Sequence, residues 1–555
     1  MLQKHPLPLL LALIIGLLHL PVVLAHPNYL LTWFNTDDAY YYFVTARNVA
    51  HGQGFTFDGI ARTNGFHPLW MFVLIPIFAL PGLYAPLRVL VVVLVALNVG
   101  TALLLFRLVR RHLSPGLAFV TALAFSLLPA IHNVTTRGGT EAGLNAFFIV
   151  LLLYCLSRTD AKKPRQVLRL SLVAALAFLA RLDNVFLAYL VGGWLVWRET
   201  RDSRTDLGSS FRAAGVYYAP LTLVLAAYML WNLIGFGTPT PVSGQVKRWW
   251  GTLPNSVYGF PPKRLENYVG QFFTDDESIG PWAIATGPYY RAAEGVVQMI
   301  GVRPTRGARR AALAGLGGLT LAGLGVLGWR NRQWAWQAVQ GLGLIPLLLG
   351  CLLQIGYYKI GGSVAQRDWY WVAEKLWVVL AGGICAEAAW RVVGSGIEKR
   401  AWGIGNRGAN MVAVGAVVIV SALLVRPHLP RIGRILSPDI AAQPGFYLRR
   451  AAWLEANTEP GARIAMTGSG SSAYFTQGRT LINLDGLINS YEYFRHMQNG
   501  TAPEYLAAIG VDYVFGNTYI LTKSDPYAGI FEGRLVEEAV FRDGEKNLIL
   551  WRFVP

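Results

Sequence analysis

Residues 88–107 read Arg-Val-Leu-Val-Val-Val-Leu-Val-Ala-Leu-Asn-Val-Gly-Thr-Ala-Leu-Leu-Leu-Phe-Arg, an apolar run bounded by Arg88 and Arg107. A helix of about 20 apolar residues crosses the roughly 30 Å hydrocarbon core of a bilayer. Similar runs recur along the chain, whose 555 residues are 54% hydrophobic and only 14% charged. Because soluble proteins carry roughly 25% charged residues, the sequence predicts a polytopic α-helical membrane protein.

About eleven membrane-spanning helices are expected from these runs. They lie near residues 8–25, 88–107, 116–131, 142–157, 167–180, 184–197, 213–235, 311–328, 337–356, 371–390 and 411–425. The first run resembles a secretory signal, but its apolar stretch of about 16 residues is long for one, so we expect it to remain as a span. Residues 66–82 are apolar but interrupted by three prolines, and an interfacial or re-entrant segment is predicted there.

Basic residues gather in connections that fall on one side of this count. The four connections lie around residues 107–111, 158–165, 198–212 and 399–407, on the same side as Lys4. Short basic loops stay in the cytoplasm. We therefore expect a multi-pass protein of the plasma (inner) membrane, with its N-terminus in the cytoplasm. Three sizeable segments would then lie outside, namely 26–87, 236–310 and the segment from about 427 to the end. One basic group, between Arg303 and Arg310, falls on the outer face and departs from the rule.

The remaining composition excludes two other classes of protein. The net charge of +18 is spread over short loops, where it would contact anionic lipid head groups, and no basic stripe with interleaved aromatics indicates nucleic acid binding. Cys155, Cys351 and Cys385 lie inside apolar spans, so they indicate buried small side chains and no disulfide or metal framework.

The segment 427–555 alternates between helical and strand periodicity. A helix is expected at 446–457, strands at 463–467, 480–484, 512–516, 535–541 and 547–553, and a further helix at 503–509. The pattern predicts a soluble C-terminal α/β domain after a transmembrane module of residues 1–426. The turn Gly468-Ser469-Gly470 is typical of ordinary turn chemistry rather than of a phosphate-binding loop.

The most informative stretch for function begins at Thr36-Asp37-Asp38, just beyond the first span. Thr36 can cap a helix, and the two aspartates then occupy its first turn, where acidic residues are common for capping alone. Carboxylates so close to a membrane are costly unless they serve a function. Adjacent helical positions point roughly 100° apart, so the two side chains cannot act together on one atom.

The residues that follow carry a resemblance to a known family. The order is Asp-Asp-Ala-Tyr at 37–40, Ala-Arg-Asn at 46–48, His-Gly-Gln-Gly at 51–54 and Thr-Asn-Gly-Phe-His-Pro-Leu-Trp at 63–70. It resembles the first outer loop of the GT-C class of polyprenyl-phosphate-sugar-dependent glycosyltransferases, including relatives of mycobacterial arabinofuranosyltransferases that add terminal residues. Looser matches are Arg-Gly-Gly-Thr-Glu at 137–141, Arg-Leu-Asp at 181–183, Pro-Thr-Pro-Val-Ser-Gly-Gln-Val-Lys at 239–247 and Gln-Arg-Asp-Trp-Tyr at 366–370.

The resemblance implies a site. Asp37 would be the general base, and Asp38 its partner or a ligand of a divalent cation, Mg²⁺ or Mn²⁺. Lys247 and Arg367 would bind the carrier phosphate. Further substrate or donor contacts would come from Tyr41, Arg47, Asn64, His67, Glu141, Arg181, Asp183 and Ser243. Plainer interpretations remain open: His67 as a structural residue, Arg47 as a residue that fixes its helix, Arg181 and Asp183 as a local pair, and Lys247 as an interfacial anchor beside two tryptophans.

The sequence thus predicts an inverting glycosyltransferase of the cell envelope. It would move a hexose or pentose from a polyprenyl-phosphate donor to a glycan or lipid-linked acceptor on the outer face. Two alternatives stay open. A transporter or flippase of lipid-linked sugars would also be polytopic, although internal repeats and midplane charges typical of transporters are not evident. A sensor or assembly protein would instead work through its soluble tail.

Overall fold

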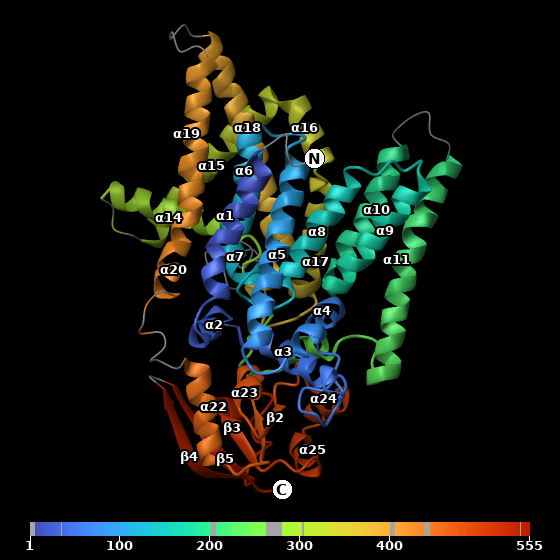
Figure 1. Cartoon of the computed structure of the whole chain (residues 1–555), viewed down its shortest axis with the longest axis vertical. Coiled ribbons are helices and arrows are strands. Elements are labelled where there is room, and N and C mark those ends of the chain that lie inside the picture. The colour runs from blue at the N-terminus through green and yellow to red at the C-terminus, as the bar shows by residue number, and fades with distance from the viewer. Residues whose placement is uncertain are drawn as a thin grey trace.

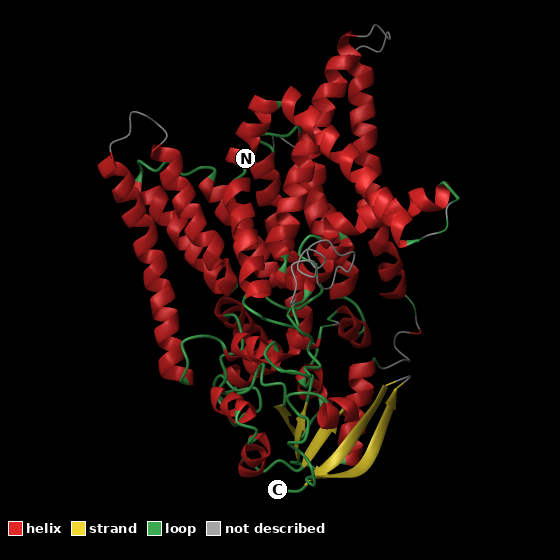
Figure 2. Ribbon diagram, turned by 180° about the vertical axis from the view of Figure 1, so that it is seen from behind, coloured by secondary structure: helices red, strands yellow, loops and turns green. Residues whose placement is uncertain are grey.

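The computed structural model describes residues 6–34, 36–200, 207–261, 280–301, 303, 305–399, 406–435, 437, 439, 445–543 and 546–555. Its two parts are a large helical bundle and a smaller domain built on a sheet (Figure 1). Figure 2 shows the sheet lying at the end of the molecule that carries the C-terminus. The fold class predicted from the sequence, a polytopic helical membrane protein with a C-terminal α/β domain, is confirmed.

Most of the bundle helices follow the predicted apolar runs. The bundle helices are α1 (Pro6–Val23), α5 (Ala85–Val109), α6 (Pro115–Leu127), α7 (Pro129–Thr135), α8 (Ala142–Leu156), α9 (Pro164–Ala180), α10 (Val185–Thr200), α11 (Leu207–Phe236), α14 (Ala283–Met299), α15 (Arg306–Arg330), α16 (Arg332–Gly341), α17 (Leu344–Ile360), α18 (Val372–Lys399), α19 (Asn406–Val425) and α20 (Leu429–Ile435). Helices α14 and α20 lie in segments where no span was expected. In the described part of the chain, 5 helices are long and apolar enough to cross a membrane, or up to 7 if each bent pair is one span. The count of eleven therefore stays a prediction.

Two expected spans are bent because of local sequence. Helices α6 and α7 meet at 57°, and α16 and α17 at 62°. Leu128 precedes Pro129 and adopts φ −56° and ψ 126°, as expected for a residue whose helical conformation the proline ring disfavours. Gly343 separates α16 from α17 with φ 67°, a conformation that glycine adopts without strain.

Short helices of the segments that are predicted to lie outside, here called the outer segments, lie between the bundle and the sheet domain. They are α2 (Pro27–Trp33), α3 (Asp37–Ala50), α4 (Pro68–Phe78) and α12 (Val242–Trp250). Thr36 occupies the N-cap position of α3, as predicted, although its side chain makes no capping hydrogen bond. Helix α4 has 11 residues, about 16 Å of helix, so it is too short to cross the hydrocarbon core.

The C-terminal domain contains a five-stranded sheet in the order β2-β1-β3-β5-β4. Its strands are β1 (Arg463–Met466), β2 (Thr480–Asn483), β3 (Tyr513–Gly516), β4 (Leu535–Asp543) and β5 (Lys546–Phe553). Strands β1, β2 and β3 are parallel, whereas β5 runs antiparallel to both of its neighbours. The helices are α22 (Phe446–Asn457), α23 (Gly470–Phe475), α24 (Tyr491–Gln498), α25 (Ala502–Ala508) and α26 (Thr518–Lys523); α24 and α26 were not expected.

The two ends of the molecule differ in character. The start of α1 and the ends of α10 and α18 lie at one end of the bundle, and the sheet domain lies at the other (Figure 1). This arrangement agrees with the predicted grouping of basic connections opposite the C-terminal domain. One apolar core, which includes Tyr40, Phe43, Phe78 and Tyr474, joins α3 and α4 to α23. The outer segments and the C-terminal domain therefore pack as neighbours.

Candidate active site

A cavity of about 660 Å³ lies where α3, α12, α17 and the α9–α10 junction converge. Its polar residues come from segments far apart in the sequence, and its wall also includes apolar side chains of α9, α10 and α11. Eight of the twelve predicted site residues line it: Asp38, Tyr41, His67, Glu141, Arg181, Asp183, Ser243 and Lys247. The other four, Asp37, Arg47, Asn64 and Arg367, are not among its lining residues.

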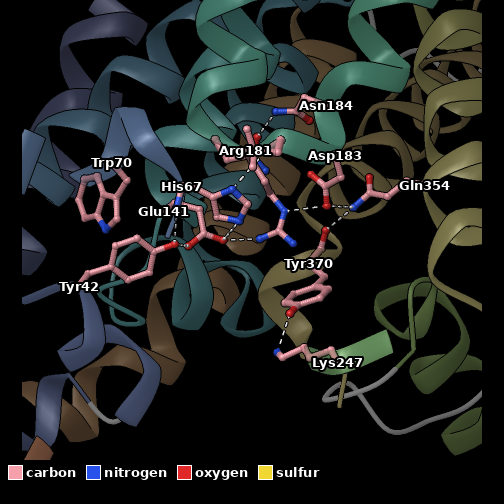
Figure 3. Close-up of polar contacts among 12 residues, drawn as sticks. Tyr42, His67, Trp70, Glu141, Arg181, Asp183, Asn184, Lys247, Gln354 and Tyr370 are labelled. Carbon is pink, nitrogen blue, oxygen red and sulfur yellow. Dashed lines mark hydrogen bonds and ion pairs between the residues drawn. The ribbon is translucent and has the colours of Figure 1, made fainter. Parts of the chain in front are cut away.

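Arg181 lies buried between two carboxylates (Figure 3). Its Nη1 donates a hydrogen bond to Glu141 Oε1, and its Nε donates to Asp183 Oδ2 at 3.0 Å. A buried guanidinium requires such partners, because an unpaired buried charge costs several kcal/mol. Arg181 and Asp183 therefore do more than pair locally: they link the start of α8, beside Glu141, to the 3₁₀ turn η2 (Leu182–Asn184) between α9 and α10.

Both carboxylates have further donors. Asp183 Oδ2 accepts hydrogen bonds from Tyr358 Oη at 2.8 Å and from Gln354 Nε2 at 3.0 Å, both on α17. Glu141 Oε2 accepts from Tyr42 Oη at 3.0 Å. Charge-assisted hydrogen bonds of this kind lower the cost of burying the ions. Tyr42, Gln354 and Tyr358 were missed in the sequence, which gives no spacing that relates α17 to Asp183.

Tyr370 lines the cavity and lies between two cations, Arg181 and Lys247 (Figure 3). It ends the 3₁₀ turn η3 (Asp368–Tyr370). The Arg181 guanidinium lies 4.4 Å from the Tyr370 ring centroid, and Lys247 Nζ donates to Tyr370 Oη at 2.7 Å. Lys247 Nζ also donates to Ala365 O at 3.4 Å, so two of its three N–H groups have protein partners. The neighbouring Arg248 lines the same cavity.

The expected motif at 366–370 contributes through its tyrosine rather than its arginine. Arg367 is exposed and does not line the cavity, whereas Tyr370 does. The structure thus places Arg367 outside the cavity, and its expected contact with the carrier phosphate stays a prediction. Arg367 is the N-cap of η3, a position that precedes the turn which carries Tyr370 into the site.

Asp37 and Asp38 face different surroundings. Asp38 lines the cavity, and its side chain makes no hydrogen bond or ion pair among the residues that the structure describes. Asp37 instead accepts hydrogen bonds from Gly470 N at 3.1 Å, Ser471 N at 2.9 Å and Ser471 Oγ at 2.5 Å. The structure therefore does not support the expected choice of Asp37 as the base, because its oxygens are occupied by the C-terminal domain.

Two other predicted contacts are structural. Arg47 Nη1 and Nη2 donate to Tyr474 O and Ala473 O, each at 3.3 Å, in the C-terminal domain. Asn64 connects the first outer segment to α11 and α12. Its Nδ2 donates a hydrogen bond to Asn232 Oδ1 at 2.9 Å, and its Oδ1 accepts one from Val242 N at 3.0 Å. A structural role in fixing its helix was one of the two interpretations of Arg47, but its partners in the C-terminal domain were not expected, and neither were those of Asn64.

His67 lies beside the Arg181 network. Its Nδ1 accepts a hydrogen bond from Leu182 N at 3.3 Å, and its Nε2 lies 3.7 Å from Glu141 Oε1. Burial, with help from the positive charge of Arg181, lowers the pKa of His67 to about 3. The imidazole is therefore neutral at physiological pH and serves as a hydrogen-bonding wall of the cavity.

The divalent cation that Asp38 was expected to bind stays a prediction. Across the described ranges, no group of three or more His, Cys, Asp or Glu side chains is arranged to hold a metal ion. Mg²⁺ is usually bound by one or two carboxylates plus waters and substrate phosphates. Asp38 offers one carboxylate, and the oxygens of Asp37 are turned to α23.

Comparison with known proteins relates the bundle to glycosyltransferases. Residues 67–232 match the family described as dolichyl-phosphate-mannose-protein mannosyltransferase. The archaeal oligosaccharyltransferase AglB from Archaeoglobus fulgidus, solved with an inhibitory peptide and a dolichol-phosphate, superposes with a TM-score of 0.51 at 12% identity, covering 98% of this chain and 73% of that one. Its apo form gives 0.51 at 14% identity, covering 94% and 70%. The chain has a GT-C-class fold.

The family match covers much of the site of this GT-C fold. It begins at His67 and includes Glu141, Arg181 and Asp183. ArnT from Cupriavidus metallidurans, bound to undecaprenyl phosphate, gives a TM-score of 0.47 at 13% identity over 96% of this chain and 98% of that one. Residues 439–548 match a family described only as a domain of unknown function. A search of curated proteins found no match. The likeness to mycobacterial arabinofuranosyltransferases stays a prediction.

Proposed function

We propose that this chain is an inverting glycosyltransferase that moves a sugar from a polyprenyl-phosphate donor to a hydroxyl group of a glycan or glycolipid. The observation that carries the proposal is the composition of one cavity. It combines Asp38, whose carboxylate has no partner among the described residues, with the cations Lys247 and Arg248. A free base and a phosphate-binding group in one cavity are what displacement at an anomeric carbon requires.

Asp38 is assigned as the general base. Its carboxylate takes the proton of the acceptor hydroxyl while the hydroxyl oxygen forms a bond to the anomeric carbon. The bond between that carbon and the phosphate oxygen breaks, and its electron pair leaves with the carrier phosphate. Because attack and departure occur on opposite faces, the configuration inverts. Asp38 suits this role because no hydrogen bond from the described residues must first be broken.

Lys247 is assigned to the leaving phosphate. Its remaining N–H group and its full positive charge can stabilise the phosphate as negative charge develops there. Tyr370 positions it through the 2.7 Å hydrogen bond. Arg181 is assigned a positioning role, because its guanidinium is already neutralised by Glu141 and Asp183.

A lipid-linked donor is favoured by the wall of the cavity. Phe178, Phe186, Leu225 and Met229 line it from α9, α10 and α11, helices of the bundle. An apolar wall next to a phosphate-binding group suits a molecule that joins a hydrocarbon chain to a phosphate. AglB and ArnT, by their names, were solved with dolichol-phosphate and undecaprenyl phosphate. We place the cavity on the outer face of the plasma membrane, because the basic connections are grouped at the opposite end of the bundle.

The test uses the purified full-length protein in nanodiscs with polyprenyl-phosphate mannose or polyprenyl-phosphate arabinofuranose and a panel of glycan acceptors. The wild type is expected to release polyprenyl phosphate and form an inverted glycoside. Asp38→Asn should lower kcat by at least about 100-fold, since general bases contribute 10²–10⁴-fold. Glu532→Gln, an exposed acid-to-amide change in the C-terminal domain, is the matched control and should retain activity.

Two results would contradict the proposal. Full turnover by Asp38→Asn would exclude it as the base. Movement of intact lipid-linked sugar across a vesicle membrane, with its phosphate bond uncleaved in the presence of every acceptor, would assign the chain to the flippases instead.

A further inference from the structure

Helix α3 lies along α23 of the C-terminal domain, and charged side chains of α3 bind both ends of that helix. Asp37, at the start of α3, accepts hydrogen bonds from the backbone N–H groups of Gly470 and Ser471, where α23 begins. Arg47, near the end of α3, donates to the carbonyl oxygens of Ala473 and Tyr474, where α23 ends. The two helices therefore run in the same direction and are joined at both ends.

Each charge is placed where the ends of a helix attract it. The first backbone N–H groups of a helix and its last carbonyl groups lack partners within the helix. They favour an anion at the start and a cation at the end. Asp37 and Arg47 supply that anion and that cation. We call the four-point contact of Asp37 and Arg47 with α23 the α3–α23 clamp.

A polar chain supports the Asp37 end of the α3–α23 clamp. Arg450, on α22, donates to Ser471 Oγ at 2.7 Å, and Ser471 Oγ donates in turn to Asp37 Oδ1 at 2.5 Å. Arg450 Nη2 itself lies 3.8 Å from Asp37 Oδ1. All three side chains are at least three-quarters buried, which strengthens their electrostatic interaction.

Tyr41 provides a second connection between α3 and the C-terminal domain. It lies one turn after Asp37, and its hydroxyl donates to Asp485 Oδ2 at 3.3 Å. Asp485 also accepts hydrogen bonds from Gly468 N at 2.7 Å and from Tyr258 Oη at 2.5 Å. One buried carboxylate therefore connects α3, the turn before α23 and the outer segment that follows α12.

The two surfaces are in close contact. A Cβ atom added at Gly470 would lie 2.3 Å from Asp37 O and 3.1 Å from Tyr41 Cδ1. A Cβ atom added at Gly65 would lie 2.0 Å from Leu487 O, again between the first outer segment and the C-terminal domain. A separation below 3.0 Å from a backbone atom would force the backbone to move, so any side chain larger than that of glycine at either position would push the two parts apart.

We propose that the C-terminal domain is a positioning element of the active site, and that Asp37 is a positioning residue through which it acts. The inference rests on the proposed function, in which Asp38 is the base. Asp38 follows Asp37 directly, and neighbouring helical positions point roughly 100° apart. Binding of Asp37 to α23 therefore sets the rotation of α3 that turns Asp38 into the cavity. Without the α3–α23 clamp, every side chain of the cavity would still be present, but the Asp38 carboxylate would no longer point at the acceptor hydroxyl.

The test compares Asp37→Asn, Arg47→Met and Ser471→Ala in the full-length protein, with Arg534→Gln as the control. Arg534 pairs with Glu504 at an exposed site of the same domain. A catalytic group displaced by about 1 Å can lose about 100-fold in rate. We expect Asp37→Asn and Arg47→Met each to lower kcat by about 10- to 100-fold with little change in KM for the donor. Ser471→Ala, which removes only one hydrogen bond, should lower it by about 2- to 10-fold.

Two readouts separate positioning from base catalysis. The acid limb of the pH–rate profile should persist in Asp37→Asn and disappear from the residual activity of Asp38→Asn. The double variant should lose less kcat than the product of the fold losses of Asp37→Asn and Arg47→Met, because both substitutions disrupt the same α3–α23 clamp. Hydrogen exchange of α23 should speed up in both variants and stay unchanged in the control.

The outcomes distinguish this inference from the proposed function. A wild-type protein that cleaves no lipid-linked sugar contradicts the proposed function. An active wild type overturns the inference if Asp37→Asn loses the acid limb while α23 keeps its protection. It is equally overturned if Arg47→Met exposes α23 to exchange and keeps full kcat.

Discussion

At the level of single residues, charge balance decides what the cavity can bind. Arg181 carries one positive charge, and Glu141 and Asp183 carry one negative charge each. This buried trio is therefore net negative and cannot by itself attract a phosphate. Lys247, which makes hydrogen bonds but no ion pair within the described part of the chain, supplies the positive charge instead. The two kinds of cation have different roles, although both lie beside Tyr370.

His67 gives a prediction about pH and stability. Its pKa is lowered from 6.5 to about 3, chiefly by burial, so the folded state binds its proton less readily than the unfolded state. The stability that depends on neutral His67 is therefore complete above pH 6.5 and is lost as the pH falls toward 3. At pH 5.5 the loss is about 1 kcal/mol.

His67→Gln removes this titrating group. We expect thermal unfolding in detergent to show a smaller drop in stability from pH 7.5 to pH 5.5 than in the wild type, by about 1 kcal/mol. His51→Gln, at an exposed histidine just after α3, is the control. If His67→Gln lost as much stability from pH 7.5 to pH 5.5 as the wild type, the fold would not be what keeps this imidazole neutral.

At the level of elements, α12 places a cation by an amphipathic arrangement. Val242, Val246 and Trp250 are buried and lie on one face of the helix, where they pack with Phe494 of the C-terminal domain. Lys247 lies beside this face and lines the cavity. The apolar face thus fixes the rotation of α12, and that rotation fixes the ammonium group.

Substitution of Lys247 tests the role of this helix. Lys247→Met keeps the length and apolar stem of the side chain but removes its charge. We expect KM for the polyprenyl-phosphate sugar to rise by about 10-fold, equivalent to about 1.4 kcal/mol, and kcat to fall as well because phosphate charge grows in the transition state. Lys523→Met, at an exposed lysine of the C-terminal domain, should leave both constants unchanged. Unaltered donor kinetics in Lys247→Met would remove it from the phosphate site.

The elements also show what the sequence could predict. Apolar length located most helices of the bundle, although not α14 or α20, and alternating periodicity located all five strands of the C-terminal domain. The helical spacing of Asp37 and Asp38 predicted that they diverge but not which one faces the cavity. That choice depends on Gly470 and Ser471, more than 430 residues away in the chain. Tyr358 and Gln354 were missed for the same reason, because their meeting with Asp183 arises only from tertiary packing.

At the level of the whole molecule, the proposed active site is built across two parts of the chain that share one apolar core. The bundle supplies Glu141, Arg181 and Asp183, and the outer segments supply Asp38 and Lys247. The C-terminal domain supplies Leu487 and Phe494 to the wall and the α3–α23 clamp to its support. A second core within that domain, which includes Ile482, Leu506 and Val514, stabilises its sheet independently of α3.

This division predicts how the protein responds to a cut between its parts. A protease site placed between residues 435 and 445 would separate the C-terminal domain covalently, yet the shared core, the α3–α23 clamp and the bond from Tyr41 to Asp485 would remain. We expect the two fragments to stay together in size-exclusion chromatography and to retain most of the activity. The same cut in Asp37→Asn weakens the α3–α23 clamp and removes the effective concentration given by the covalent connection, so its fragments should dissociate at a higher concentration than those of the cut wild type. Separation of the cut wild-type fragments would show instead that the linker, and not the contacts with α3, keeps the C-terminal domain in place.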